Sequence, residues 1–275
     1  MELEVRALAS GSSGNAFLIR TSAPGARALL LDAGLSARAL ERLLCRYNVL
    51  PGDLAALIIT HEHHDHARGA LPLARRYGAP LVCTPGTAAA LGAALAGVEV
   101  RRLHSDGVSI GALDLWSFPV PHDAAEPCGL VLRCGRLTVG LALDLGHAPA
   151  HVAEALRQAD LVIVEANHDR EKLLAAPYPW STKHRIMGER GHLSNLQAAQ
   201  LLAAIAADGR PRDVWLAHLS EQANEHPQSV LRHVANALDL LGISWLRLDV
   251  AQRDRPSAVW AGGQALHQSS LLDLF

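Results

Sequence analysis

The sequence predicts an α/β fold of four layers, an αββα sandwich in which two β-sheets pack face to face between two layers of helices. Strand-like apolar segments outnumber what one doubly wound sheet needs, and helix-like segments occur in both halves of the chain. No linker or low-complexity tract interrupts them. We therefore expect one domain over residues 1–262, made of two α/β halves (1–121 and 122–262), and a C-terminal tail over residues 263–275.

The first half is expected to alternate strands with helices. The turn-rich segment Ser10–Asn15 separates the first two strands. The longest stretch without charge, residues 77–98, contains Pro80 and Pro85, so it predicts a strand followed by a helix and not a membrane span. Strands are predicted at residues 3–9, 16–20, 28–31, 55–60, 81–83, 98–103 and 113–119, and a helix at residues 36–47.

The second half repeats this pattern with apolar strands and longer helices. Strands are predicted at residues 129–134, 137–143, 161–165, 213–217 and 243–248. Helices are predicted at residues 149–158, 194–206 and 227–240.

Composition excludes several classes of protein. Of the 275 residues, 49% are hydrophobic and 19% are charged, which favours a folded core over a disordered chain. The net charge of −2 excludes a generally basic nucleic-acid coat, so any phosphate binding must use a local patch. The four cysteines form no C-x-x-C pair, and no secretory signal precedes them; we expect reduced thiols in a cytoplasmic protein.

The segment Thr60–His66 concentrates groups that bind metal ions. Four histidines and two carboxylates fall within residues 61–66, directly after a predicted buried strand. Histidines two positions apart point the same way in extended backbone, and imidazole and carboxylate are the ligands that zinc-like ions prefer. The sequence therefore predicts a metal site here. The alternative, a solvated polar loop, fits this density of ligands poorly.

The pattern His61-x-His63-x-Asp65-His66 resembles the signature of the metallo-β-lactamase fold. Four further residues at predicted strand ends match the remaining motifs of that family in order, namely Asp32, His122, Asp144 and His218. The resemblance implies two metal sites: His61, His63 and His122 at one, Asp65, His66 and His218 at the other, with Asp144 bridging and Asp32 bracing the histidine loop. His64 matches no ligand position and is expected at the surface.

Three further segments are similar to the WalJ (YycJ) subfamily of bacterial nucleases, which is related to RNase Z-type nucleases. They are residues 9–15, 165–169 and 191–195, and the sequence around Tyr178-Pro179-Trp180 resembles the same subfamily. His192 resembles an extra histidine that RNase Z-like nucleases place before the last ligand, so we expect it to act as a general acid. Leu143, before the bridging Asp144, departs from the pattern, which favours a small hydroxyl residue.

The resemblance implies a metal-dependent DNA phosphodiesterase, a 5′-to-3′ exonuclease in DNA repair, that attacks with a hydroxide held between two divalent ions (Zn or Mn). Asp65 would also orient this nucleophile. DNA contacts are expected from Ser12, Asn15, Lys183, Arg185 and Ser194. The alternative is a hydrolase of a small thioester, lactone or cyclic phosphodiester on the same two ions, which the negative net charge favours.

The C-terminal tail ends in Leu272-Asp273-Leu274-Phe275. This segment resembles the end of the peptide by which bacterial repair proteins bind the DNA sliding clamp, which makes the clamp a candidate partner. The alternative is that these apolar side chains pack on the chain's own surface or across a dimer, since burying each contributes about 1.5–3 kcal/mol. The oligomeric state is not predicted.

Overall fold

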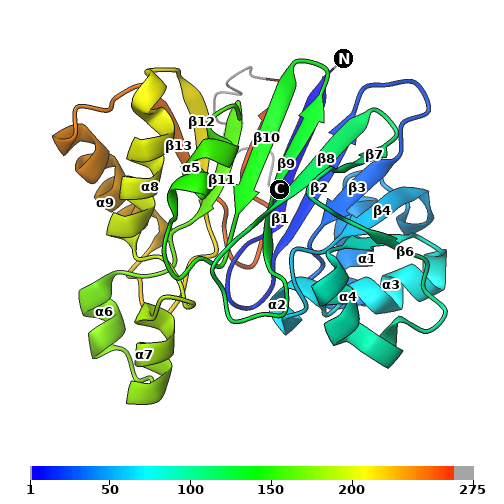
Figure 1. Ribbon diagram of the computed structural model, residues 1–275, viewed down its shortest axis with the longest axis horizontal. Helices are drawn as coiled ribbons and strands as arrows, with labels where there is room; N and C mark the ends of the chain where they lie inside the picture. Colours follow the sequence, from blue (N-terminus) through cyan, green and yellow to red (C-terminus); the bar gives the residue numbers. More distant parts are fainter. Residues whose placement is uncertain (1, 263–275) are drawn as a thin grey trace.

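The computed structural model describes residues 2–262 and confirms the four-layer αββα arrangement (Figure 1). Two seven-stranded sheets lie between helices. The first sheet, in the order β14-β1-β2-β3-β4-β5-β6, contains β1 (Leu3–Ala9), β2 (Ala16–Thr21), β3 (Ala28–Leu31), β4 (Leu54–Ile58), β5 (Leu81–Cys83), β6 (Val100–Arg102) and β14 (Val259–Ala261). The second, in the order β13-β12-β11-β10-β9-β8-β7, contains β7 (Val108–Ile110), β8 (Leu113–Pro119), β9 (Cys128–Cys134), β10 (Leu137–Ala142), β11 (Leu161–Glu165), β12 (Arg212–Ala217) and β13 (Leu246–Val250).

Helices cover the outer face of each sheet. The first sheet is covered by α1 (Ala37–Arg46), α3 (Ala70–Tyr77) and α4 (Pro85–Leu91), and the second by α5 (Ala150–Leu156), α8 (Asn195–Ile205) and α9 (Pro227–Leu240). The short helix α2 (His64–Ala67) lies at the lower edge of the sheets in Figure 1. From the same edge, α6 (Arg170–Ala175) and α7 (Trp180–Met187) extend away from the body.

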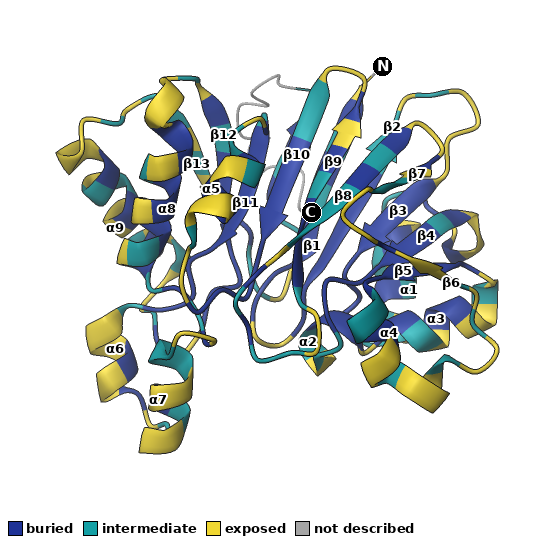
Figure 2. Ribbon diagram, in the orientation of Figure 1, coloured by how far each residue is buried: buried dark blue, intermediate teal, exposed yellow. Residues whose placement is uncertain are grey.

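Three apolar clusters fill the spaces between the four layers, and the strands of both sheets are largely buried (Figure 2). The central cluster joins the inner faces of both sheets and includes Phe17 and Leu31 from the first sheet and Leu130 and Ile163 from the second. The other two clusters pack each sheet against its own helices. Since each strand alternates its side chains between two covered faces, most strand residues are buried, as the continuous apolar runs predicted.

The boundary between the two halves differs from the expected one near residue 121. The hairpin β7-β8 belongs to the second sheet, because β8 pairs antiparallel with β9, so the sheets divide the chain between Arg102 and Val108. β14 then returns to the first sheet and pairs antiparallel with β1, Val5 opposite Trp260. This long-range pairing covers the edge of β1.

Several elements lie outside the expected set. α2, α3, α6, α7, β7 and β14 were not predicted, and the strand expected at 243–248 is shifted to Leu246–Val250. The segment 77–98 does form a strand and then a helix, β5 and α4. Within residues 2–262, no helix is long and apolar enough to cross a membrane, and Cys45, Cys83 and Cys128 are free thiols. The clamp-like segment Leu272–Phe275 lies outside the described residues.

Candidate metal centre

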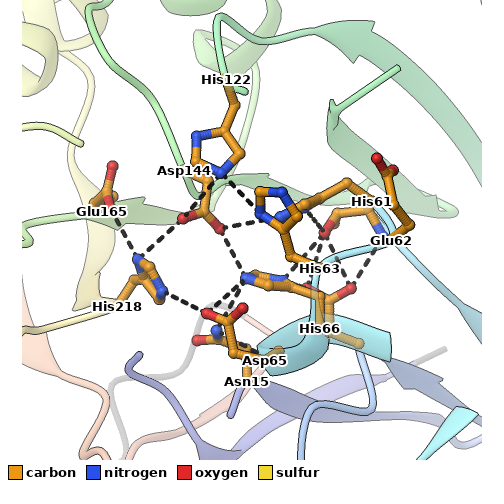
Figure 3. A network of polar contacts seen from close by, with 12 residues as sticks. Asn15, His61, Glu62, His63, Asp65, His66, His122, Asp144, Glu165 and His218 are labelled. Carbon is orange, nitrogen blue, oxygen red and sulfur yellow. Dashed lines mark hydrogen bonds and ion pairs between the residues drawn. The ribbon is translucent and has the colours of Figure 1, made fainter. Parts of the chain in front are cut away.

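The residues of the predicted ligand series come together at one edge of the two sheets (Figure 3). Each follows the end of a strand: Asp32 follows β3, His61 and His63 follow β4, His122 follows β8, Asp144 follows β10, and His218 follows β12. Asp65 and His66 lie on α2. Residues as far apart in sequence as Asp32 and His218 therefore meet because the strands that position them end at the same edge.

Left-handed backbone occurs at three of these strand ends. Asp32, Asp144 and His218 have φ values of 55°, 57° and 52°. A residue with a side chain seldom adopts this conformation, which costs on the order of 1–3 kcal/mol where the surroundings enforce it. The chain thus turns sharply after each strand and keeps these side chains buried at the site. The strained backbone is found at candidate functional residues.

His61, His63 and His122 form the three-histidine group. The Nδ1 atom of His63 lies 3.2 Å from Nε2 of His122, whose Nδ1 donates to the carbonyl oxygen of Gly191 at 3.2 Å. Thr60 Oγ1 lies 3.1 Å from His61 Nδ1. Burial lowers the pKa of His61 and of His122, so both rings stay neutral and keep a lone pair for a metal ion.

Asp65, His66 and His218 form the Asp65 group, whose rings contact buried carboxylates. The Nδ1 atom of His66 lies 2.7 Å from Asp32, and Nδ1 of His218 lies 2.9 Å from Glu165. The Nε2 atoms of both rings face Asp65, at 3.6 and 3.2 Å. Such carboxylate–histidine pairs fix the ring orientation and make the free nitrogen a stronger ligand.

The carboxylates of this second group also control its protonation. Burial opposes the charged form of His218, but Asp144, Asp65 and Glu165 outweigh it and raise the pKa of His218 to about 10. In the same way Asp32 and Asp144 overcome burial and raise the pKa of His66. A site that holds protons this strongly has a negative potential that also attracts divalent cations.

Asp144 lies between the two groups. Its Oδ2 is 2.7 Å from His66 Nε2 and 3.9 Å from His61 Nε2, while its Oδ1 is 3.3 Å from His218 Nδ1. The side chain is 2% exposed. This position between the two groups is the one expected of a bridging carboxylate.

The donor set fits divalent cations. His61 Nε2 is buried and makes no hydrogen bond to any residue in 2–262, an arrangement that is costly unless a ligand meets it. Three nitrogens converge in the first group and two nitrogens with one oxygen in the second, each set within 4.8 Å. Imidazole with carboxylate suits zinc, and the carboxylates also suit manganese.

Glu165 is more central than its sequence suggests. Its carboxylate accepts from His192 Nδ1 at 2.7 Å and His218 Nδ1 at 2.9 Å, and from the backbone N–H groups of Leu145 and Leu193. Burial opposes its charge, but His192 and His218 outweigh it and lower the pKa of Glu165 to about 2. In the sequence, Glu165 belonged only to a family-like segment; its position at the end of β11, between β10 and β12, was the available signal.

His192 contacts the centre through one ring nitrogen. Its Nδ1 lies 2.7 Å from Glu165 and 3.2 Å from Asp144, so Nε2 is the nitrogen left to act on a substrate. Burial opposes its charge, but these two carboxylates raise the pKa of His192 to about 9. The side chain is 14% exposed, so it borders both the buried centre and solvent.

Three of the expected DNA contacts make hydrogen bonds or close contacts within the fold. Lys183 is buried, and its Nζ donates to the carbonyl oxygen of Leu174 at 2.5 Å, which joins α7 to the end of α6. Ser194 is the N-cap of α8 and accepts from Gln197 N. Asn15 is buried against the loop it closes and lies 3.1 Å from His66 Nε2.

The other two expected DNA contacts are exposed. Ser12 lies on the turn before β2. The guanidinium of Arg185 donates from Nε to Asp123 Oδ2 at 2.6 Å, and the Oδ1 atom of Asp123 is 3.3 Å from Nε2 of His122. Arg185 therefore lies at the rim of the three-histidine group. Asp123 was not predicted as a site residue, although it directly follows a predicted ligand, His122.

Comparison with known proteins agrees with this geometry. A family model described as "Beta-lactamase superfamily domain" matches residues 27–219. Exodeoxyribonuclease WalJ of Streptococcus pneumoniae serotype 2 (strain D39) is 37% identical over 223 residues, which cover 79% of this chain and 81% of the relative. Exodeoxyribonuclease YycJ of Bacillus anthracis is 33% identical over 228 residues, covering 82% and 85%. The metallo-beta-lactamase fold protein YhfI from Bacillus subtilis, 18% identical, has a TM-score of 0.69 and covers 95% of this chain and 99% of its own.

The fold and the histidine–aspartate cluster together define a class, the metallohydrolases of the metallo-β-lactamase fold. Within the β-lactamase superfamily, the chain belongs to the family of the WalJ and YycJ proteins. The resemblance seen in the sequence motifs is confirmed.

Proposed function

We propose that this chain is a metal-dependent DNA phosphodiesterase that acts as a 5′-to-3′ exonuclease in DNA repair. The observation that carries the proposal is its 33–37% identity, over about four fifths of the chain, to two proteins named exodeoxyribonucleases. The geometry of the centre supports hydrolysis, and an exposed arginine at its rim, Arg185, supports a phosphate-bearing substrate. A DNA substrate favours the cytoplasm as its location.

In this proposal the two groups would each hold one divalent cation, zinc or manganese, and Asp144, which lies between the groups, would serve both. Bound cations would supply a nucleophile derived from water at neutral pH and positive charge beside the phosphate. The remaining chemistry belongs to side chains. Asp65 accepts a hydrogen bond from the attacking water, and Asp32 and Glu165 hold the rings of His66 and His218 in place.

His192 serves the leaving group. With Nδ1 held by Glu165, its Nε2–H donates a proton to the oxygen that departs from phosphorus. The carboxylates beside Nδ1 favour the charged ring, which is the form that can donate. His192 is therefore assigned as the general acid.

The test is cleavage of DNA labelled at either the 5′ or the 3′ end, by the full chain supplied with zinc or manganese after removal of bound metal. We expect nucleotides to be released progressively from the 5′ end. His64→Ala provides the matched control, because His64 lies in the same motif but is exposed and outside both groups. Its activity should equal that of the unmodified chain.

Parallel assays with a thioester, a lactone and a cyclic phosphodiester test the alternative activity. Cleavage of one of these small substrates without any cleavage of DNA would refute the proposal. Release from the 3′ end would refute the polarity alone.

A further inference from the structure

A helical arm beside the metal centre has an exposed face that the proposed mechanism does not use. The arm, residues 170–190, contains α6 and α7, which extend from the sheet edge where the site lies (Figure 1). It carries five basic residues (Arg170, Lys172, Lys183, Arg185 and Arg190) and two acidic ones (Glu171 and Glu189), a net charge of 5 − 2 = +3. The whole chain has a net charge of −2. The arm is therefore more basic in sequence than the chain as a whole, although Lys183 is buried and Arg185 pairs with Asp123.

One face of α7 is exposed along its length. Trp180, Ser181, His184 and Arg185 are all exposed, at the spacing that places them on one side of a helix, whereas Lys183 points into the arm. The Trp180 residue is 61% exposed, and its ring centroid lies 4.8 Å from that of His184. Among the large exposed hydrophobic residues of the described chain, Trp180 is the aromatic one.

The C-terminal end of the arm is held against the metal centre. Arg185 pairs with Asp123, and the guanidinium of Arg190 donates twice to the carbonyl oxygen of His122, at 3.0 and 2.8 Å. Because Trp180 precedes Arg185 by five residues, the helix separates them by roughly 7.5 Å along its axis. The exposed ring thus lies at a fixed offset from a metal ligand.

We propose that Trp180 and His184 form a stacking platform for the unpaired bases of a DNA strand whose phosphate lies at the metal centre. This inference rests on the proposed function and adds the form of substrate. An exposed ring stacks on the face of any base, but only where the base is free of its neighbours in a duplex. The cationic arm attracts the phosphates of the same strand.

The experiment compares Trp180→Ala, Trp180→Phe and the control Leu240→Ala, which removes a large exposed side chain from α9 (89% exposed). Binding of a labelled single strand of about ten nucleotides is measured by fluorescence anisotropy on metal-free protein. Hydrolysis of bis(4-nitrophenyl) phosphate, a small diester without a nucleobase, is measured on the metal-loaded enzyme. Size-exclusion chromatography reports the oligomeric state.

We expect Trp180→Ala to raise the dissociation constant at least about 10-fold, Trp180→Phe to restore most of the loss, and Leu240→Ala to change nothing. Hydrolysis of the small ester should be the same in all variants. Equal binding by Trp180→Ala and the parent chain, an equal loss on the small ester, or a changed oligomeric state in Trp180→Ala would each overturn the platform. Strand binding through Trp180 without any cleavage of DNA would instead refute the proposed function alone.

Discussion

The two ligand groups differ in what holds their histidines. In the three-histidine group the Nδ1 atoms of His61 and His122 contact neutral partners, a threonine hydroxyl and a backbone carbonyl, and burial lowers the pKa of both rings. In the Asp65 group the rings of His66 and His218 each contact a buried carboxylate, and the pKa of both is raised.

This difference indicates a division of labour within one site. Carboxylate partners increase the basicity of the ligating nitrogen and fix its direction, so the Asp65 group should bind its cation more tightly. The three-histidine group offers neutral nitrogens with weaker support. Its cation should therefore be lost first on dilution or chelation.

Asp144→Ala should have the largest effect, because Asp144 contacts both groups. Removing it leaves two cations facing each other without a shared anion. We expect activity to fall to background and less than two equivalents of metal to remain. Elemental analysis alongside turnover checks this, and two bound ions with full turnover would refute the assignment.

His192→Ala should lower turnover by roughly 10²–10⁴-fold while metal content stays the same, because His192 contacts Asp144 and Glu165 but is assigned to the leaving group. The measurement is turnover with metal analysis on the same sample. Loss of metal in this variant would place His192 among the ligands.

Glu165→Gln sharpens the contrast between the groups. It keeps one oxygen but removes the charge beside His218, so the metal affinity of the Asp65 group should fall roughly 10–100-fold. Competition with a chelator of known affinity measures this. If the weaker of the two binding events changed instead of the tighter, the proposed order of affinities would be wrong.

The sequence predicted the ligands of both groups but not the buried partners that distinguish the groups. The ligands themselves follow predicted strands and match a known motif order, and strands such as β1 and β11 were predicted to the residue. Glu165 could not be assigned a role, since its importance depends on the parallel pairing of β10, β11 and β12, which brings it to His218.

Other features depend on contacts that local patterns do not encode. β14 pairs with β1 across about 250 residues of chain, and a strand of three apolar residues such as β14 carries no sequence signal for that pairing. Lys183 belongs to a basic run, as a DNA-binding residue would, yet its ammonium group donates a hydrogen bond to the carbonyl oxygen of Leu174 at the end of α6. The left-handed backbone of Asp144 and His218 is likewise imposed by the surrounding sheet edge.

Arg185→Ala should have the smallest effect. Arg185 pairs with Asp123 at the rim of the three-histidine group, so its loss should weaken DNA binding several-fold and reduce the slope of log affinity against log salt by about 0.7 for a single strand. Lys183→Met is the matched control, because Lys183 is buried and should change thermal stability but not the slope. Equal slopes in the parent chain and Arg185→Ala would remove Arg185 from the DNA-binding surface.

The most direct test is to reconstitute the metal-free chain stepwise with zinc or manganese while measuring both bound metal and cleavage of 5′-labelled DNA. If the two groups each hold a cation and act together, the first equivalent should bind tightly with little activity, and activity should rise with the second. Full activity at one equivalent, or undiminished activity in the metal-free chain, would contradict the account.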